Sequence, residues 1–223
     1  RDRATGEVMS IGRTMEESLL KAMRSLETGV CHIYHKKFDD WTNDRLLEYI
    51  AEPTDDRLYA IAQLIRGGVD LVLIYNRTKI DMFFLEKFKN IVEFERVVEA
   101  APMDIEVLRE AKRMGFSDKF IGQLWGVSQH DMYLLREKNG IFPVYKMIDT
   151  CASEFSSYVP YFYSTYEDEN ESLVSDKEKI VVLGSGPIRI GQGVEFDYST
   201  VHAIWSIREA GYAVSYTHLT LPT

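Results

Sequence analysis

Hydrophobic residues recur at helical spacing through the first 140 residues of the chain. A helix is expected over residues 15–27, because Thr14 and Glu17 have the spacing of a capping box and leucine and methionine recur behind them. In such a box the Thr14 hydroxyl accepts from the Glu17 amide, and the Glu17 carboxylate accepts from the Thr14 amide. From about residue 42 to 140, shorter apolar runs follow, each opened by Ser, Thr, Asp or Asn and closed by Gly. This pattern predicts a cluster of short helices.

Three other patterns differ from this one. The apolar run at residues 69–75 favours a short buried strand by its periodicity, although runs of this length also occur in helices. Aromatic, β-favouring segments lie at 142–146 and 161–163, after the helical part. The acidic, polar stretch at 167–176 then predicts a linker and a domain boundary.

The last part of the chain has the order of an α/β unit. A buried-strand pattern at 179–183 leads into a glycine-rich turn and then into a helix that ends at Gly211. Residues 212–214 have the composition of a strand that begins there. We therefore expect half of a βαβ unit, and an α+β fold class for a chain that is mainly helical.

The glycine-rich turn is the strongest chemical signal, because a turn between a strand and a helix points backbone N–H groups at an anion. The dinucleotide fingerprint fails, since Arg189 stands at its third glycine position, and the Walker loop fails, since Gln192 stands where lysine belongs. Two interpretations stay open: a phosphate-proximal loop, and glycines that only allow a tight turn. The glycines concerned are Gly184, Gly186, Gly191 and Gly193.

Composition is that of an ordinary globular protein. The residues are 45% hydrophobic and 27% charged. The length of 223 residues is enough for one large domain or two smaller ones. Cys31 and Cys151 have no metal-type spacing, and no nearby carboxylate or cysteine completes a tetrahedral set with His32 and His35, so we expect reduced thiols and no metal site. Because no apolar run approaches the ~20 residues of a membrane helix, and none follows the N-terminus as a signal core, we expect a cytoplasmic protein without a membrane partner.

Residues 117–138 have the pattern of a helix-turn-helix, with Ser128 at the start of the second helix. This raises an alternative function, an acidic helical module that binds DNA. The net charge of −9, and the mixture of Arg136 and Lys138 with Asp131 in the second helix, count against it. A helix that binds a DNA groove needs surplus positive charge, so a helical hairpin without nucleic acid is the simpler interpretation.

Three longer segments carry a family resemblance. They are residues 5–22, which begin Thr5-Gly6-Glu7-Val8-Met9-Ser10-Ile11-Gly12-Arg13-Thr14, residues 146–155, which read Lys146-Met147-Ile148-Asp149-Thr150-Cys151-Ala152-Ser153-Glu154-Phe155, and residues 183–211. Shorter motifs lie between them at 55–58, 78–81 and 111–118. From residue 5 to about residue 213, the chain resembles the large chain of carbamoyl phosphate synthetase.

The resemblance implies a domain organisation. That large chain has two synthetase halves, each with a pre-ATP-grasp and an ATP-grasp domain, and a helical oligomerisation domain between them; this chain resembles the central joint. On that basis residues 69–75 are helical, and a Rossmann-like pre-ATP-grasp domain contributes its first strand, turn and helix. The expected parts are the end of the carboxyphosphate synthetic half (1–28), the helical oligomerisation domain (29–170), a linker (171–176), the start of the pre-ATP-grasp domain of the carbamoyl phosphate synthetic half (177–213) and a tail outside the family pattern (214–223).

The resemblance also implies an activity for the whole enzyme. It is a ligase that makes carbamoyl phosphate from bicarbonate, glutamine-derived ammonia and two ATP, with magnesium and a glutaminase small subunit, for pyrimidine and arginine synthesis. Since ATP and magnesium sites belong to the ATP-grasp domains, we expect the segment itself to be structural and self-associating, inactive alone, and without a catalytic residue, metal or cofactor. By resemblance, Glu7 and Glu195 lie along the carbamate tunnel. The family's loop with Asn-Pro-Glu-Thr is missing after Ala213.

Overall fold

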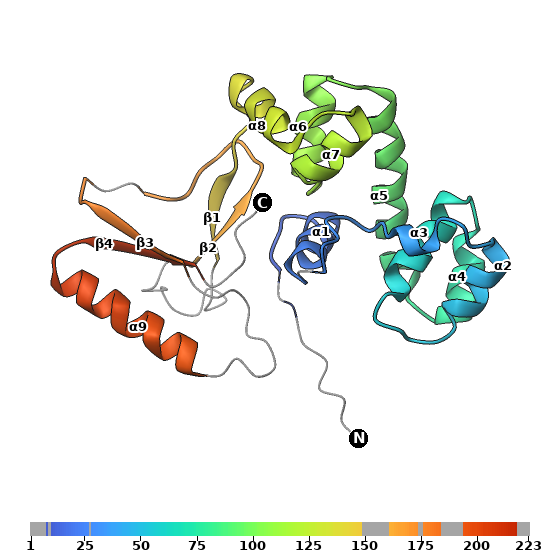
Figure 1. The fold of residues 1–223 in the computed structure, drawn as a ribbon, viewed down its shortest axis with the longest axis horizontal. Helices are drawn as coiled ribbons and strands as arrows, with labels where there is room; N and C mark the ends of the chain where they lie inside the picture. The colour runs from blue at the N-terminus through green and yellow to red at the C-terminus, as the bar shows by residue number, and fades with distance from the viewer. Residues whose placement is uncertain are drawn as a thin grey trace.

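A computed structural model describes residues 8, 10–26, 28–148, 161–173, 176–183 and 194–217 (Figure 1). Within these residues the chain is mainly helical and carries two small sheets. Helices and strands follow in the order α1 (Met15–Ser25), the 3₁₀ helix η1 (Lys36–Phe38), α2 (Asn43–Tyr49), α3 (Arg57–Arg66), α4 (Leu71–Thr78), α5 (Met82–Ala100), α6 (Ile105–Arg113), α7 (Asp118–Trp125), α8 (Gln129–Lys138), β1 (Val144–Ile148), β2 (Tyr161–Thr165), β3 (Lys179–Leu183), α9 (Val194–Glu209) and β4 (Ala213–Thr217).

The first helix begins where the capping box predicts. The Thr14 hydroxyl accepts from the Glu17 amide at 3.1 Å, which confirms the cap. The second half of the box is wrong, because the Glu17 carboxylate accepts from the amide of Arg13, at 2.7 Å, rather than from that of Thr14. α1 ends at Ser25, two residues before the predicted end.

The predicted series of short helices is confirmed, and side-chain caps explain most of the helix starts. In each capped helix a side-chain oxygen accepts from a backbone N–H of the first turn, which otherwise lacks a partner. Glycines with positive φ follow several of the helices, as the closing glycines of the pattern require. The capping residues from α2 onward are Thr42, Asp70, Asp81, Asp104, Ser117 and Ser128.

The strand predicted at residues 69–75 from periodicity is wrong, and the helix implied by the family resemblance is confirmed. Asp70 caps α4 by accepting from the Val72 amide at 2.8 Å. Ile74 is the buried residue of α4, whereas its other apolar side chains stay partly or largely exposed. The run is therefore one face of a short surface helix and not a strand buried on both sides.

The long helix α5 is the centre of the helical part. It packs against α3 and α4 near one end, α6 and α7 near the other, and α1 between them (Figure 1). Its inward stripe repeats every three or four residues through Leu85, Phe88, Ile91 and Val98, all buried. Each such side chain contributes about 1.5–3 kcal/mol when fully buried, so this stripe stabilises the packing of both groups of helices.

Two separate strand pairs follow the helices. β1 and β2 pair antiparallel, with Val144 opposite Thr165 and Ile148 opposite Tyr161, which confirms the β-favouring segments. β3 and β4 pair parallel, from Lys179 opposite Ala213 onward, and α9 connects them. The expectation of half a βαβ unit is therefore wrong: the described residues form a complete one, because the strand begun at residue 213 continues to Thr217.

Gly115 lies where α1 meets the turn between α6 and α7. Its φ is +96°, and a Cβ there would lie 2.9 Å from the Cα of Glu17. We expect Gly115→Ala to lower the free energy of unfolding by about 3 kcal/mol or more, through backbone strain and displacement of α1. Gly126 is the matched control, because its φ is +68° but an added Cβ would have nothing within 4 Å, so Gly126→Ala should cost about 1 kcal/mol. Urea denaturation measures both; equal losses would show that α1 does not press on Gly115.

Candidate functional site

The residues predicted for the tunnel and the glycine turn lie largely outside the described part of the chain. Glu7 and the four glycines, Gly184, Gly186, Gly191 and Gly193, fall outside the described residues, and so does the side chain of Glu195. Position 195 itself is in the first turn of α9, and β3 ends at Leu183. The predictions for these residues therefore stay predictions.

A buried ion cluster joins α6, α7 and α8. The Asp118 carboxylate lies 3.0 Å from the Lys112 ammonium and 2.7 Å from Nη2 of Arg136, with a second contact at 2.9 Å from Nε. The three side chains are only 6%, 7% and 9% exposed for Lys112, Asp118 and Arg136. Lys112 also donates to the Phe116 carbonyl at 2.8 Å, and Arg136 to the Ile141 carbonyl at 3.0 Å. One carboxylate thus forms ion pairs with two buried cations.

Burial shifts the pKa of several groups around this cluster. It lowers the pKa of Lys112 to about 8, although the Asp118 charge opposes the shift. Burial also raises the pKa of Tyr166, which covers both cations with its ring, to about 12. For Asp118 burial alone would raise the pKa, but Lys112 and Arg136 outweigh it and lower the pKa. The carboxylate is therefore held in its charged form between its partners.

This cluster also bears on whether the helix-turn-helix at residues 117–138 exposes the positive charge that DNA binding requires. α7 and α8 form two successive packed helices, and Ser128 caps the second by accepting from the Asp131 amide at 3.1 Å. The Arg136 side chain, a candidate phosphate contact, points inward to Asp118 instead. Because a groove-binding helix must expose its cations, the alternative of DNA binding is not supported.

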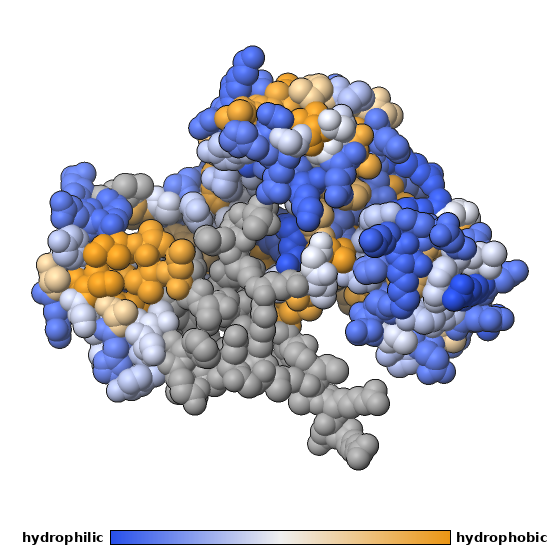
Figure 2. Space-filling view, viewed as in Figure 1, coloured by the Kyte–Doolittle hydropathy of each residue, from blue (hydrophilic) through white to orange (hydrophobic). Residues whose placement is uncertain are grey.

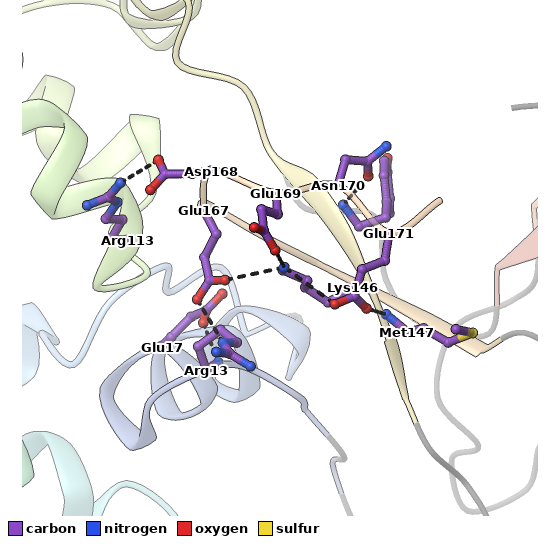
Figure 3. A network of polar contacts seen from close by, with 11 residues as sticks. Arg13, Glu17, Arg113, Lys146, Met147, Glu167, Asp168, Glu169, Asn170 and Glu171 are labelled. Atoms are coloured by element: carbon purple, nitrogen blue, oxygen red, sulfur yellow. Dashed lines mark hydrogen bonds and ion pairs between the residues drawn. The ribbon is translucent and has the colours of Figure 1, made fainter. Parts of the chain in front are cut away.

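A second polar network holds the start of the predicted linker against the rest of the molecule (Figure 3). Arg13, just before α1, donates to Glu167 at 2.7 Å, and Arg113 at the end of α6 donates to Asp168 at 2.9 Å. The buried ammonium of Lys146 in β1 lies within 4 Å of three carboxylates, those of Glu167, Glu169 and Glu171. Residues 167–171 therefore lie along β1 and connect it to α1 and α6.

His32 takes part in a third buried group and is not placed as a metal ligand. Its Nε2 lies 2.8 Å from the Glu95 carboxylate, which also accepts two hydrogen bonds from Arg66. The ring stacks on Phe120 at 3.6 Å between centroids, and burial lowers the pKa of His32. Within the described ranges, no three His, Cys, Asp or Glu side chains converge as a metal site requires. Sequence reasoning missed this contact, although Glu95 interrupts the apolar stripe of α5.

Exposed apolar side chains concentrate on α4 and the first turn of α5. We name this set the α4–α5 face; Val72, Leu73 and Phe83 are 53%, 51% and 51% exposed. Tyr75 and Phe84, on the same two helix segments, are exposed as well, and the rings of Phe83 and Phe84 are in contact. A second apolar surface lies on part of the β3–α9–β4 unit and forms the orange area on the left of Figure 2. Clustered apolar exposure of this kind marks surfaces that other protein covers.

Comparison with known families decides the assignment. Residues 7–140, more than half of the 223, match the family described as carbamoyl-phosphate synthetase large chain, oligomerisation domain. The chain belongs to the carbamoyl-phosphate synthetase large chain family. Residues 176–218 match a second family, the carbamoyl phosphate synthase preATP-grasp domain, and this range contains β3, α9 and β4.

The family assignment confirms the resemblance seen in the sequence and the expected fold class. The carbamoyl-phosphate synthetase large chain belongs to a ligase, and this chain is a segment of such a large chain with an oligomerisation and a pre-ATP-grasp region. An oligomerisation domain supports self-association. Among the helices described, none is both long enough and apolar enough to span a bilayer.

Proposed function

We propose that this chain is the structural joint of the large chain, that it holds copies of that chain together, and that it carries out no chemistry alone. The observation that carries the proposal is the match of residues 7–140 to an oligomerisation domain, combined with the α4–α5 face inside that range. Two buried ion groups of the helical part support it too, since His32 pairs with Glu95, and Lys112 and Arg136 pair with Asp118.

We propose the domain division that the sequence predicts. In this division helices α2 to α8 and the β1–β2 pair form one unit, because Asp168 accepts from Arg113 of α6 and Glu169 lies 3.8 Å from Lys146 of β1. The bond from Arg13 to Glu167 joins this unit to the part at 1–28. The linker is proposed at 171–176, and its first residue, Glu171, still donates its amide to the Tyr145 carbonyl at 2.8 Å. The expected parts are 1–28, 29–170, 171–176, 177–213 and the tail 214–223, although the preATP-grasp match continues to residue 218.

In this proposal the whole enzyme makes carbamoyl phosphate in the cytoplasm for pyrimidine and arginine synthesis, from bicarbonate, ammonia supplied by a glutaminase small subunit, and two ATP with magnesium. Magnesium prefers several carboxylate and carbonyl oxygens together, and in the described part of the chain the three carboxylates that do come together, those of Glu167, Glu169 and Glu171, surround the Lys146 ammonium instead. We therefore assign ATP and magnesium binding to other parts of the large chain. The role of this segment is to hold copies of the large chain together.

Glu7 and Glu195 are proposed to line the route that carries carbamate between the two synthetase sites, with Gly184, Gly186, Gly191 and Gly193 forming the turn beside it. A tight glycine turn after β3 allows the backbone to approach a small anion closely. The proposal is supported by the βαβ unit of β3, α9 and β4, because residues 184–193 follow the carboxyl end of β3 in the sequence.

A second copy of this chain is the proposed occupant of the α4–α5 face. Two-fold dimers are the commonest assemblies, and in them the same patch meets itself, so one exposed apolar face is sufficient. The face is also bordered by the charged side chains of Lys79 and Lys87, which lie over Tyr75 and Phe83. An apolar centre with a polar rim is the usual anatomy of an interface.

Light scattering on the purified chain tests this proposal. The monomer mass is 25.8 kDa, so we expect a mass that rises with concentration toward at least twice that value. Raised salt should change this little, because burial of apolar surface is not screened by ions. A mass of 25.8 kDa at every concentration would contradict the proposal.

A further inference from the structure

A cavity of about 710 Å³ lies between α1, the α6–α7 turn, α8 and the β1–β2 pair. Its volume is within the ~300–1,000 Å³ of small-molecule sites. Five aromatic side chains line it, with Phe116 and Tyr166 more buried and Tyr133, Phe142 and Tyr145 more exposed. The charged side chains that line it come from the helices α1, α6, α7 and α8.

The charges that line this cavity do not balance. The cationic side chains are Lys21, Arg24, Lys112 and Arg136, whereas the carboxylates are Glu17 and Asp118. Lys21 pairs with Glu17 at 2.8 Å, and Lys112 and Arg136 share Asp118. The cavity wall therefore carries surplus positive charge in a chain whose net charge is −9.

Arg24 is the cation left without a carboxylate. Its Nη1 donates to the Gly115 carbonyl at 2.6 Å, and across the described ranges no carboxylate forms an ion pair with it. Burial lowers the pKa of Arg24, and carboxylates act on it only at longer range. A guanidinium has five N–H donors in a planar fork that fits a carboxylate or phosphate group. Most of these donors have no acceptor among the described residues.

We propose that this cavity is a binding site for a small organic anion with an aromatic or apolar body. The anionic group binds Arg24 at the helical side, where the positive charge of Lys112 and Arg136 adds to the attraction. The apolar body lies against the ring of Tyr166 and the aromatic side chains near the opening. This site is independent of the α4–α5 face and of the chemistry of the enzyme.

Calorimetric titration of the chain with phenyl phosphate at constant ionic strength tests the proposal. Benzyl alcohol has the ring without the charge, and inorganic phosphate has the charge without the ring; both should bind at least about tenfold more weakly, since each keeps only one of the two interactions. Arg24→Gln should weaken the binding of phenyl phosphate by about tenfold or more, and Arg24→Lys should weaken it by less. The matched control is Lys138→Gln, which removes an exposed charge of α8 outside the cavity. This substitution should change the affinity for phenyl phosphate by less than about twofold.

NMR chemical shifts of the backbone amides give a second readout. They are measured on the wild-type chain, so the test does not require a substituted chain to fold. Phenyl phosphate should shift the amides of Ser117, Tyr133 and Thr165, which line the cavity, and leave α4 unchanged. The proposal is overturned by absence of saturable binding, by equal affinity for benzyl alcohol, by binding that Arg24→Gln leaves intact, or by shifts scattered over the surface.

Discussion

Asp118→Asn is expected to lower the free energy of unfolding by about 3–5 kcal/mol, a large share of the stability of a domain of this size. The substitution keeps the shape of the side chain and removes its charge. Lys112 and Arg136 then stay buried without a counterion, and each loses a charge-assisted hydrogen bond. Urea denaturation followed by circular dichroism measures the change.

Two further variants show whether charge causes this loss. Glu106→Gln removes an exposed carboxylate that lies 3.9 Å from Arg109 and should change stability by less than about 1 kcal/mol. The triple replacement Asp118→Leu, Lys112→Met and Arg136→Met removes all three charges and should be more stable than Asp118→Asn alone, because no unpaired charge stays buried. If Asp118→Asn costs no more than Glu106→Gln, the cluster does not hold α6, α7 and α8 together.

Leu73→Glu is expected to raise the dissociation constant of self-association by about 30-fold or more. A carboxylate at the centre of an apolar interface must lose its water, and in a two-fold dimer this cost applies to both copies. Phe83→Glu, on the first turn of α5, should act in the same direction. Sedimentation equilibrium over a concentration series measures the constant, and circular dichroism checks that the helices are intact.

The matched control for Leu73→Glu is Leu134→Glu on α8, because Leu134 is 45% exposed and Leu73 is 51% exposed. It introduces the same charge outside the α4–α5 face, so its dissociation constant should stay within about threefold of that of the unaltered chain. If both substitutions weaken self-association equally, the effect is one of net charge, and the α4–α5 face is not the interface.

The helices were predictable because their signals are local. Caps such as Ser128 and Thr14 act within one turn, and the apolar stripe of α5 repeats along a single helix. The error at residues 69–75 has a local cause as well: an eight-residue surface helix exposes much of its apolar sequence, and without knowledge of burial its pattern cannot be distinguished from that of a strand.

The polar networks were not predictable, because they join residues that are distant in sequence. Arg13 and Glu167 are 154 positions apart, and His32 and Glu95 are 63 apart. The acidic stretch after β2 looks like a free linker until Lys146 and Arg113 are placed beside it. The surplus charge of Arg24 likewise becomes visible only when α1 is docked on the α6–α7 turn.

We propose that this segment serves assembly and leaves the chemistry to the rest of the large chain. The direct measurement is carbamoyl phosphate formation by the purified chain with ATP, magnesium, bicarbonate and ammonia, followed with radiolabelled bicarbonate. We expect no ATP-dependent product above the protein-free reaction, at chain concentrations where light scattering detects association. ATP-dependent carbamoyl phosphate that increases in proportion to the concentration of this chain would contradict the account.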